Sequence, residues 1–168
     1  MTGWRNNWNG PSFAVEEEVL GESNVEYVTV FTNAITNSAM EAGQSTDCFV
    51  VRDATSADDH PAEIIVGEGP NGANCIKVVG KTNPAEEWDT RFFIYTPNKK
   101  WEAGEKYKLS MWVKATKEIG TDSQVHSTPG NYKHWAMLSP NPTFTTEWKK
   151  LEWESTIPAE GGGEQQTI

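Results

Sequence analysis

The sequence predicts an all-β protein built as an antiparallel β-sandwich or barrel. Short runs rich in β-branched and aromatic residues recur along the chain, and Gly, Pro, Asn and Asp separate them. Helical periodicity is weak throughout. The 168 residues are enough for one domain with a substantial core. Many short strands at this spacing are typical of sandwiches and barrels.

Four strands are expected in the first part of the chain. They are the runs VEYVTVF at 25–31, DCFVVRD at 47–53, NCIKVVG at 74–80 and DTRFFIYT at 89–96. Each is rich in residues that favour the pleated backbone, and the turn segment EGPNGAN leads into the third. In the fourth run, alternation places Asp89, Arg91 and Phe93 on one face and Phe92 on the other.

Four more strands are expected in the second part of the chain. They are KYKLSMWVKAT at 106–116, SQVHS at 123–127, YKHWAML at 132–138 and KKLEWESTI at 149–157. The turn segments TPNKKWEAGE, STPGN and SPNP bound them. Apolar residues that alternate with polar ones favour strands with one buried face. The expected core residues are Phe92, Leu109, Met111, Val113, Leu151 and Trp153.

The two ends of the chain differ from this pattern. Residues 1–24, with NNWNGPS and EEE, are expected to form an irregular lead-in or edge segment, and residues 25–168 to form the sandwich. EGGG near the end predicts a loop, and a further strand begins at GGGEQQTI. A sandwich without its last strand has an unpaired edge. We therefore expect a domain excised from a larger modular protein.

Charge and composition narrow the function classes. Lys plus Arg number 14 and Asp plus Glu number 24, which gives a net charge of −10. An acidic surface repels a polyanion, so no nucleic-acid partner is expected. No apolar run approaches the length that spans a bilayer, so no membrane insertion is expected. Eight Trp, six Phe and four Tyr in a polar chain predict that some rings lie at the surface.

The two cysteines, Cys48 and Cys75, are too few for a disulfide framework or a cysteine-rich zinc site. Both lie in predicted strands. A bridge between them is one interpretation, and two buried free thiols is the preferred one.

Several segments resemble the carbohydrate-binding modules related to family 4. WEAGEKYKLSMWVKAT is similar to their aGktYtlsfwvka strand, AMEAGQSTDCFVV to their FE-x-G segment, NCIKVVGK to their alkv strand, and TFTTEWKKLEWESTIPAE to their v-x-T-x-x-W stretch. The order and spacing of these segments, over residues 38–160, carry the resemblance. EEWDTRFFI and QVHSTPGNYKHW resemble versions seen in gut Bacteroidetes, some of them inserted in family 10 xylanases.

The resemblance implies a β-jelly-roll that binds polysaccharide chains, often xylan, without cleaving them. It also implies a covalently attached glycoside hydrolase, an endo-1,4-β-xylanase, in a secreted, periplasmic or cell-surface protein. Residue chemistry points the same way, because a sugar ring has a C–H-rich face and a rim of hydroxyls. Aromatic rings cover the face, and amide, imidazole, carboxylate and guanidinium groups bind the rim.

The first stretch with this chemistry is EEWDTRFF. Trp88 precedes the predicted strand, where its ring can lean over a cleft, and Asp89 and Arg91 share a strand face. The alternative is a core Trp88 with a surface ion pair between Asp89 and Arg91. The related modules often have Gln where Arg91 stands, and a guanidinium there leaves room for acidic xylan substituents.

The second stretch is QVHSTPGNYKHW. Because Val125 is apolar, Gln124 and His126 are expected to face away from the core. Tyr132 and His134 would then join them across the hairpin. The competing assignment exposes Trp135 as the sugar-stacking ring and buries Tyr132.

Metal sites are weighed at the same residues. His126 and His134 lie eight positions apart across a turn, and a zinc site needs further ligands that nothing in the sequence brings near. Asp58, Asp59 and His60 are residue types that could supply such ligands. Structural calcium is the favoured ion, with Glu41 matching the Glu of the FE-x-G segment, although the domain requires no cofactor for binding.

Two rival classes remain open. A β-sandwich glycoside hydrolase needs two carboxylates across a cleft. The pair Glu152 and Glu154 instead shares one strand face, which predicts a solvated polar face with Leu151 and Trp153 inward. No catalytic residue is assigned. A protein-binding or adhesion sandwich is the third class, and the aromatic residues beside Gln and His favour sugar over it.

Overall fold

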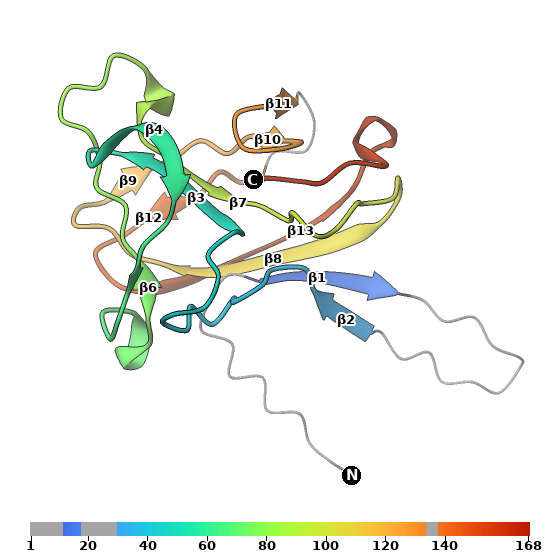
Figure 1. The fold of residues 1–168 in the computed structure, drawn as a ribbon, viewed down its shortest axis with the longest axis horizontal. Coiled ribbons are helices and arrows are strands. Elements are labelled where there is room, and N and C mark those ends of the chain that lie inside the picture. The colour runs from blue at the N-terminus through green and yellow to red at the C-terminus, as the bar shows by residue number, and fades with distance from the viewer. Residues whose placement is uncertain (1–11, 18–29, 134–137) are drawn as a thin grey trace, which may run out of the picture.

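The computed structural model describes residues 12–17, 30–133 and 138–168, and this part of the chain is all-β. Its helices are three short 3-10 turns: η1 (Pro70–Gly72), η2 (Glu87–Asp89) and η3 (Ala159–Gly161). Figure 1 shows the strands arranged above and below the long strands β8 and β13. No helix within the described ranges is long and apolar enough to cross a bilayer.

The larger sheet has four antiparallel strands in the order β13, β8, β1, β2. Their bounds are β1 (Ser12–Glu17), β2 (Val30–Asn33), β8 (Lys106–Val113) and β13 (Lys149–Thr156). β8 and β13 pair along their whole length, from Lys149 opposite Val113 to Thr156 opposite Lys106. Tyr107, Leu109, Met111 and Val113 alternate along β8 and are buried, as a strand with one core face requires.

The second sheet has three antiparallel strands in the order β4, β3, β7. Their bounds are β3 (Phe49–Asp53), β4 (Ser56–Pro61) and β7 (Arg91–Ile94). In β3, residues Phe49, Val51 and Asp53 are buried, while Val50 and Arg52 point to the other face. The register sets Arg52 opposite Arg91, so both arginines lie on that outer face.

The last residues of the described chain extend this sheet. Ile168 exchanges two backbone hydrogen bonds with Ile94, and Thr167 exchanges two with His126. The segment 164–168 therefore connects β7 to the hairpin of β10 (Val125–His126) and β11 (Tyr132–Lys133). Figure 1 shows the C-terminus beside β10. Two further two-stranded ladders pair β5 (Ile64–Ile65) with β6 (Cys75–Ile76), and β9 (Ile119–Gly120) with β12 (Thr143–Phe144).

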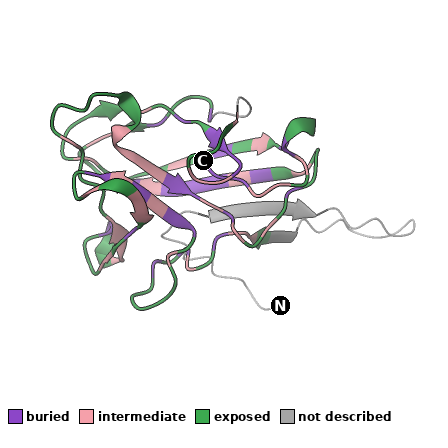
Figure 2. Cartoon of the chain, turned by 45° about the horizontal axis from the view of Figure 1, so that its top comes forward, coloured by how far each residue is buried: buried purple, intermediate pink, exposed green. Residues whose placement is uncertain are grey.

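One cluster of buried side chains draws on both larger sheets. It includes Phe49 and Val51 of β3, Leu109 of β8 and the fully buried Trp101. The Trp101 indole Nε1 donates a 2.9 Å hydrogen bond to Thr96 Oγ1, which satisfies the polar atom of this ring. Figure 2 shows the buried residues concentrated in the strands and the exposed ones in the loops.

The predicted core is confirmed. Leu109, Met111, Val113 and Trp153 are buried, and Phe92 and Leu151 are partly buried against the cluster. Cys48 and Cys75 are both free thiols, as preferred from the sequence, but only Cys48 is buried and Cys75 is half-buried. Burial is the main reason that the pKa of each thiol is raised.

Several predicted elements differ from the structure. Residues 12–17, assigned to an irregular lead-in or edge, form β1, which lies inside the larger sheet between β8 and β2. The strand predicted at 74–80 is shorter in the structure, where β6 covers only Cys75–Ile76. Strand β4 was not predicted, because its sequence SADDHP is polar. Two predicted runs lie mostly outside the described residues. Of the run at 25–31, residues 30–31 are described, and of the run at 132–138, residues 132–133 and 138 are described. The predicted strand near GGGEQQTI is confirmed as a paired segment.

Candidate functional site

The candidate site is built on the outer face of β7, β10 and β11. Four side chains form a continuous row there: Arg91, Phe93, His126 and Tyr132. The Arg91 guanidinium carbon lies 5.2 Å from the Phe93 ring centroid. The Phe93 and His126 centroids are 5.0 Å apart, and those of His126 and Tyr132 are 5.4 Å apart, both in edge-to-face geometry. We call this row the aromatic face.

His126 faces away from Val125, as predicted, and it pairs across the hairpin with Tyr132. The side chain is nevertheless covered, with an exposed fraction of 8%. Burial lowers the pKa of His126, and the nearby Arg91 lowers it further, while Asp59 acts in the opposite direction. The imidazole is therefore held neutral, and its Nδ1 is buried without a hydrogen-bond partner.

Arg91 is held by a carboxylate that the sequence did not link to it. Its Nε donates to Asp59 Oδ1 at 2.8 Å and its Nη2 donates to Asp59 Oδ2 at 2.5 Å. This bidentate pair crosses from β7 to β4, and Arg52 of the intervening strand β3 lies 3.4 Å from the same carboxylate. Gly130, at φ +83°, brings the β10–β11 turn beside it, because a Cβ there would lie 3.9 Å from Asp59 Oδ2. The pair fixes the guanidinium plane over Phe93.

Asp89 does not share a strand face with Arg91, so that prediction is wrong. It belongs to the 3-10 turn η2, where its carboxylate accepts hydrogen bonds from the backbone N–H groups of Ala85 and Glu86. These two bonds are the main reason that the pKa of Asp89 is lowered. Its role is to cap the turn that carries Trp88. Trp88 itself is 56% exposed, which excludes the alternative of a core Trp88.

The remaining predicted contacts are partly described. Gln124 is exposed at the end of the hairpin, two residues from His126, and its Nε2 lies 3.5 Å from Asp122 Oδ2. Tyr132 is 39% exposed, in agreement with the assignment that places it beside His126. His134 and Trp135 lie outside the described residues. The structure thus brings together Arg91, His126 and Tyr132.

Three contributors were missed from the sequence: Asp59, Arg52 and Phe93. Phe93 is the centre of the row and is 4% exposed. Its position two residues after Arg91 was the available signal, since both then share a strand face. Asp59 and Arg52 could be found only by pairing β4 with β3, because Asp59 lies 32 residues from Arg91 in the chain.

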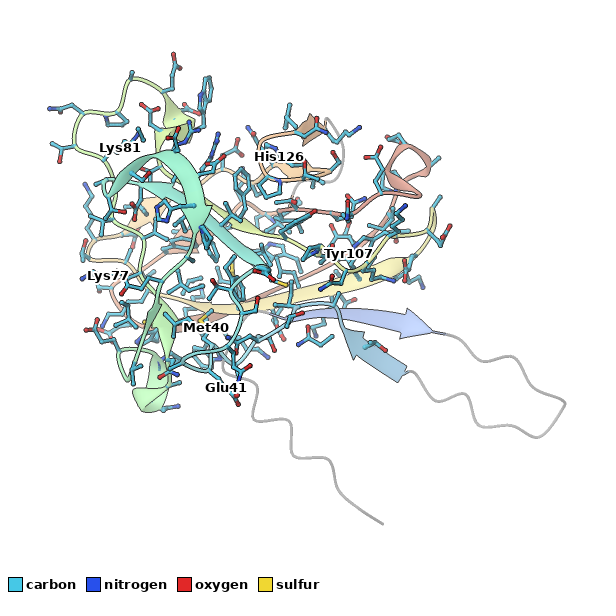
Figure 3. The ribbon with its side chains drawn as sticks, in the orientation of Figure 1. Met40, Glu41, Lys77, Lys81, Tyr107 and His126 are labelled. Atoms are coloured by element: carbon cyan, nitrogen blue, oxygen red, sulfur yellow. The ribbon has the colours of Figure 1, made fainter. Side chains whose placement is uncertain are left out.

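Glu41, the predicted calcium ligand, lies on an exposed loop. Figure 3 shows it at the opposite end of the view from His126. Its backbone N–H donates to Asn37 Oδ1, and the side chain lines a shallow depression with Asn37, Ser38 and Ser45. No group of three or more His, Cys, Asp or Glu side chains suited to a metal occurs among the described residues. The calcium site stays a prediction.

Glu152 and Glu154 lie on the outward face of β13, in agreement with the predicted polar face. Glu152 lies 2.8 Å from the Lys150 ammonium, and Lys108 of β8 lies within 3.8 Å of both carboxylates. The Lys150 hydrogen bond is the main reason that the pKa of Glu152 is lowered. The two carboxylates are neighbours on one surface and do not face each other across a cleft, as a hydrolytic pair would.

Comparison with models of protein families, with curated proteins and with solved structures found no match for this chain. The function must therefore be inferred from the residues of the site and from the sequence resemblance.

Proposed function

We propose that this chain is a non-catalytic carbohydrate-binding module whose ligand is a β-1,4-linked plant polysaccharide, with xylan first among the candidates. The architecture that we propose for it is a jelly-roll sandwich. The observation that carries the proposal is the row Arg91–Phe93–His126–Tyr132, which runs across three strands and ends in a partly exposed ring. The sequence resemblance to modules related to family 4 supports the same reading.

The exposed side chains near the ends of strands β7, β10 and β11 have the chemistry that a sugar chain needs. Tyr132 and Trp88 are the two exposed large aromatic rings of the described residues, and each offers a flat apolar surface to a C–H-rich sugar face. Gln124 is exposed beside His126 and offers an amide donor and acceptor for the hydroxyl rim. We assign stacking on the sugar rings to Tyr132 and Trp88, and hydrogen bonds with the sugar hydroxyls to Gln124. The Arg91–Asp59 ion pair lies at the buried end of the row.

Preformed geometry supports weak but specific binding. The Arg91–Asp59 pair and the edge contacts of His126 fix the row before a ligand arrives, so little side-chain entropy is lost. A few contacts of this kind leave roughly −4 to −7 kcal/mol, or about millimolar to ten micromolar affinity. Such affinity is useful in a module tethered to a family 10 xylanase, because it raises the substrate concentration near the catalytic domain. Secretion or display at the cell surface is the location that this role requires.

Affinity electrophoresis tests the proposal, with xylan, cellulose, mixed-linkage β-glucan and mannan in parallel gels. We expect retardation by xylan and weak or no retardation by mannan. Tyr132→Ala should reduce the retardation, while the matched variant Lys150→Ala on the opposite sheet should not. A reducing-sugar assay on the same xylan should give no product. Absence of retardation by all four polysaccharides would refute the proposal.

A further inference from the structure

Arg52 is a guanidinium that makes no hydrogen bond to the part of the chain that the structure describes. It lies on the outer face of β3, directly opposite Arg91 in the register. Arg91 donates hydrogen bonds to both carboxylate oxygens of Asp59. Arg52 therefore makes only an ion pair with this carboxylate, with 3.4 Å between its Nε and Asp59 Oδ1, and no hydrogen bond to any described residue. Its Nε is buried without a hydrogen-bond partner, and its side chain keeps 25% exposure. A charged donor in this state is costly unless something accepts from it.

The nearby carboxylates leave the donors of Arg52 largely unused. On the sheet itself, two guanidinium groups share the single carboxylate of Asp59. Asp89 is close enough for Arg52 and Lys81 to lower its pKa, but its oxygens accept hydrogen bonds from the backbone of its own turn. Figure 3 shows Lys81 on the same side of the view as β4. Exposed Glu86 and Glu87 lie on that same turn, so the case for Arg52 is its unused donors and not a surplus of positive charge.

We propose that Arg52 binds the carboxylate of an acidic sugar, so that the module selects glycans that carry uronate groups. This inference rests on the proposed function and narrows its substrate class. The planar guanidinium matches a carboxylate with two parallel N–H···O bonds, which a neutral hydroxyl cannot accept with the same strength. Trp88 precedes Asp89 in turn η2, and Asp89 is within the electrostatic reach of Arg52. We therefore place the stacked sugar on Trp88 and its acidic substituent at Arg52.

The experiment compares glucuronoxylan with the same polymer after reduction of its carboxyl groups, which keeps the chain and removes the charge. Wild-type protein should bind glucuronoxylan about tenfold more tightly in affinity gels, the factor expected for one added charge-assisted bond. Arg52→Gln should lower this preference to below about twofold, because affinity for glucuronoxylan falls more than affinity for the reduced polymer. Glu87, exposed on the same turn, repels an anion, so Glu87→Gln should strengthen binding of the acidic polymer.

Two controls make the result specific. Lys150→Gln removes a cation from the opposite sheet and should leave the preference intact. A parallel arm with polygalacturonate separates a uronate in the main chain from one on a side group. The preference should also shrink as NaCl rises to about 0.5 M, because salt screens the charge.

Equal binding of the acidic and reduced polymers by the wild type overturns the inference and leaves the proposed function standing. Binding to neither polymer overturns the proposed function itself. Equal loss of both polymers in Arg52→Gln would show a purely structural role and also overturns the inference. If Arg52→Gln does not fold, the wild-type comparison of the two polymers still decides the question.

Discussion

Trp88→Ala separates a binding role from a structural role, because the side chain is exposed and yet aromatic. The residue is 56% exposed, which corresponds to about 140 Å² of a ring system that has about 250 Å² available. A pyranose stacked on one face covers roughly half of that area, or about 70 Å². At about 25 cal/mol/Å² this burial is worth about 1.7 kcal/mol, so the variant should bind xylan about 15- to 20-fold more weakly.

The cost to folding should be small by comparison. Just under half of the residue is buried in the free protein, so area alone sets an upper limit of about 2 kcal/mol after allowance for a compact unfolded state. Trp101 supplies the matched control, since it is fully buried and its indole donates to Thr96. Trp101→Ala should cost about 4 kcal/mol or more.

Two assays read these effects in parallel. Isothermal titration with xylohexaose measures affinity, and urea unfolding followed by fluorescence measures the free energy of unfolding. Retained affinity in Trp88→Ala would refute the stacking role. A loss of stability equal to that of Trp101→Ala would refute the description of an exposed ring.

The remaining predictions concern stability. The folded pKa of His126 lies below its ordinary value of 6.5, so neutral His126 contributes its full stability above pH 6.5, and this stability is lost as the pH falls through the folded pKa. Urea unfolding at several pH values should show the loss, and His126→Asn should reduce the dependence on pH. Asp59→Asn leaves two partly buried guanidinium groups without their carboxylate and should cost about 1–3 kcal/mol in urea unfolding, much of which Arg91→Gln in the same chain should restore; an unchanged midpoint would contradict the pairing. Leu109→Ala empties a fully buried position and should cost about 3 kcal/mol by the same method, and a cost below about 1 kcal/mol would contradict its place in the core.

The elements that the sequence predicted well are those with strong local patterns. β8 and β13 contain runs in which apolar and polar residues alternate, Lys106–Met111 in β8 and Lys150–Glu154 in β13, so their faces and core residues could be predicted directly. β4 was missed for the opposite reason. SADDHP has little strand propensity of its own and is held by its pairing with β3, a contact that the local sequence does not encode.

The site shows the same division. The hairpin around Gly130 brings His126 and Tyr132 together over a few residues, and alternation was enough to predict that they share a face. The partner of Arg91 was beyond reach, because Asp59 comes from a strand two positions away in the sheet. Asp89 could have been assigned correctly, since Glu86 and Asp89 form the reciprocal hydrogen bonds of a capping box, which has a recognisable spacing.

The central claim is that the aromatic face binds a glycan chain, and an NMR titration of isotope-labelled protein with xylohexaose tests it most directly. We predict saturable shifts of the Trp88 indole N–H, the Gln124 side-chain amide and the Tyr132 ring, with no shifts along Lys150 and Glu152 of β13. Shifts confined to β13, or no shifts at millimolar ligand, would contradict the account.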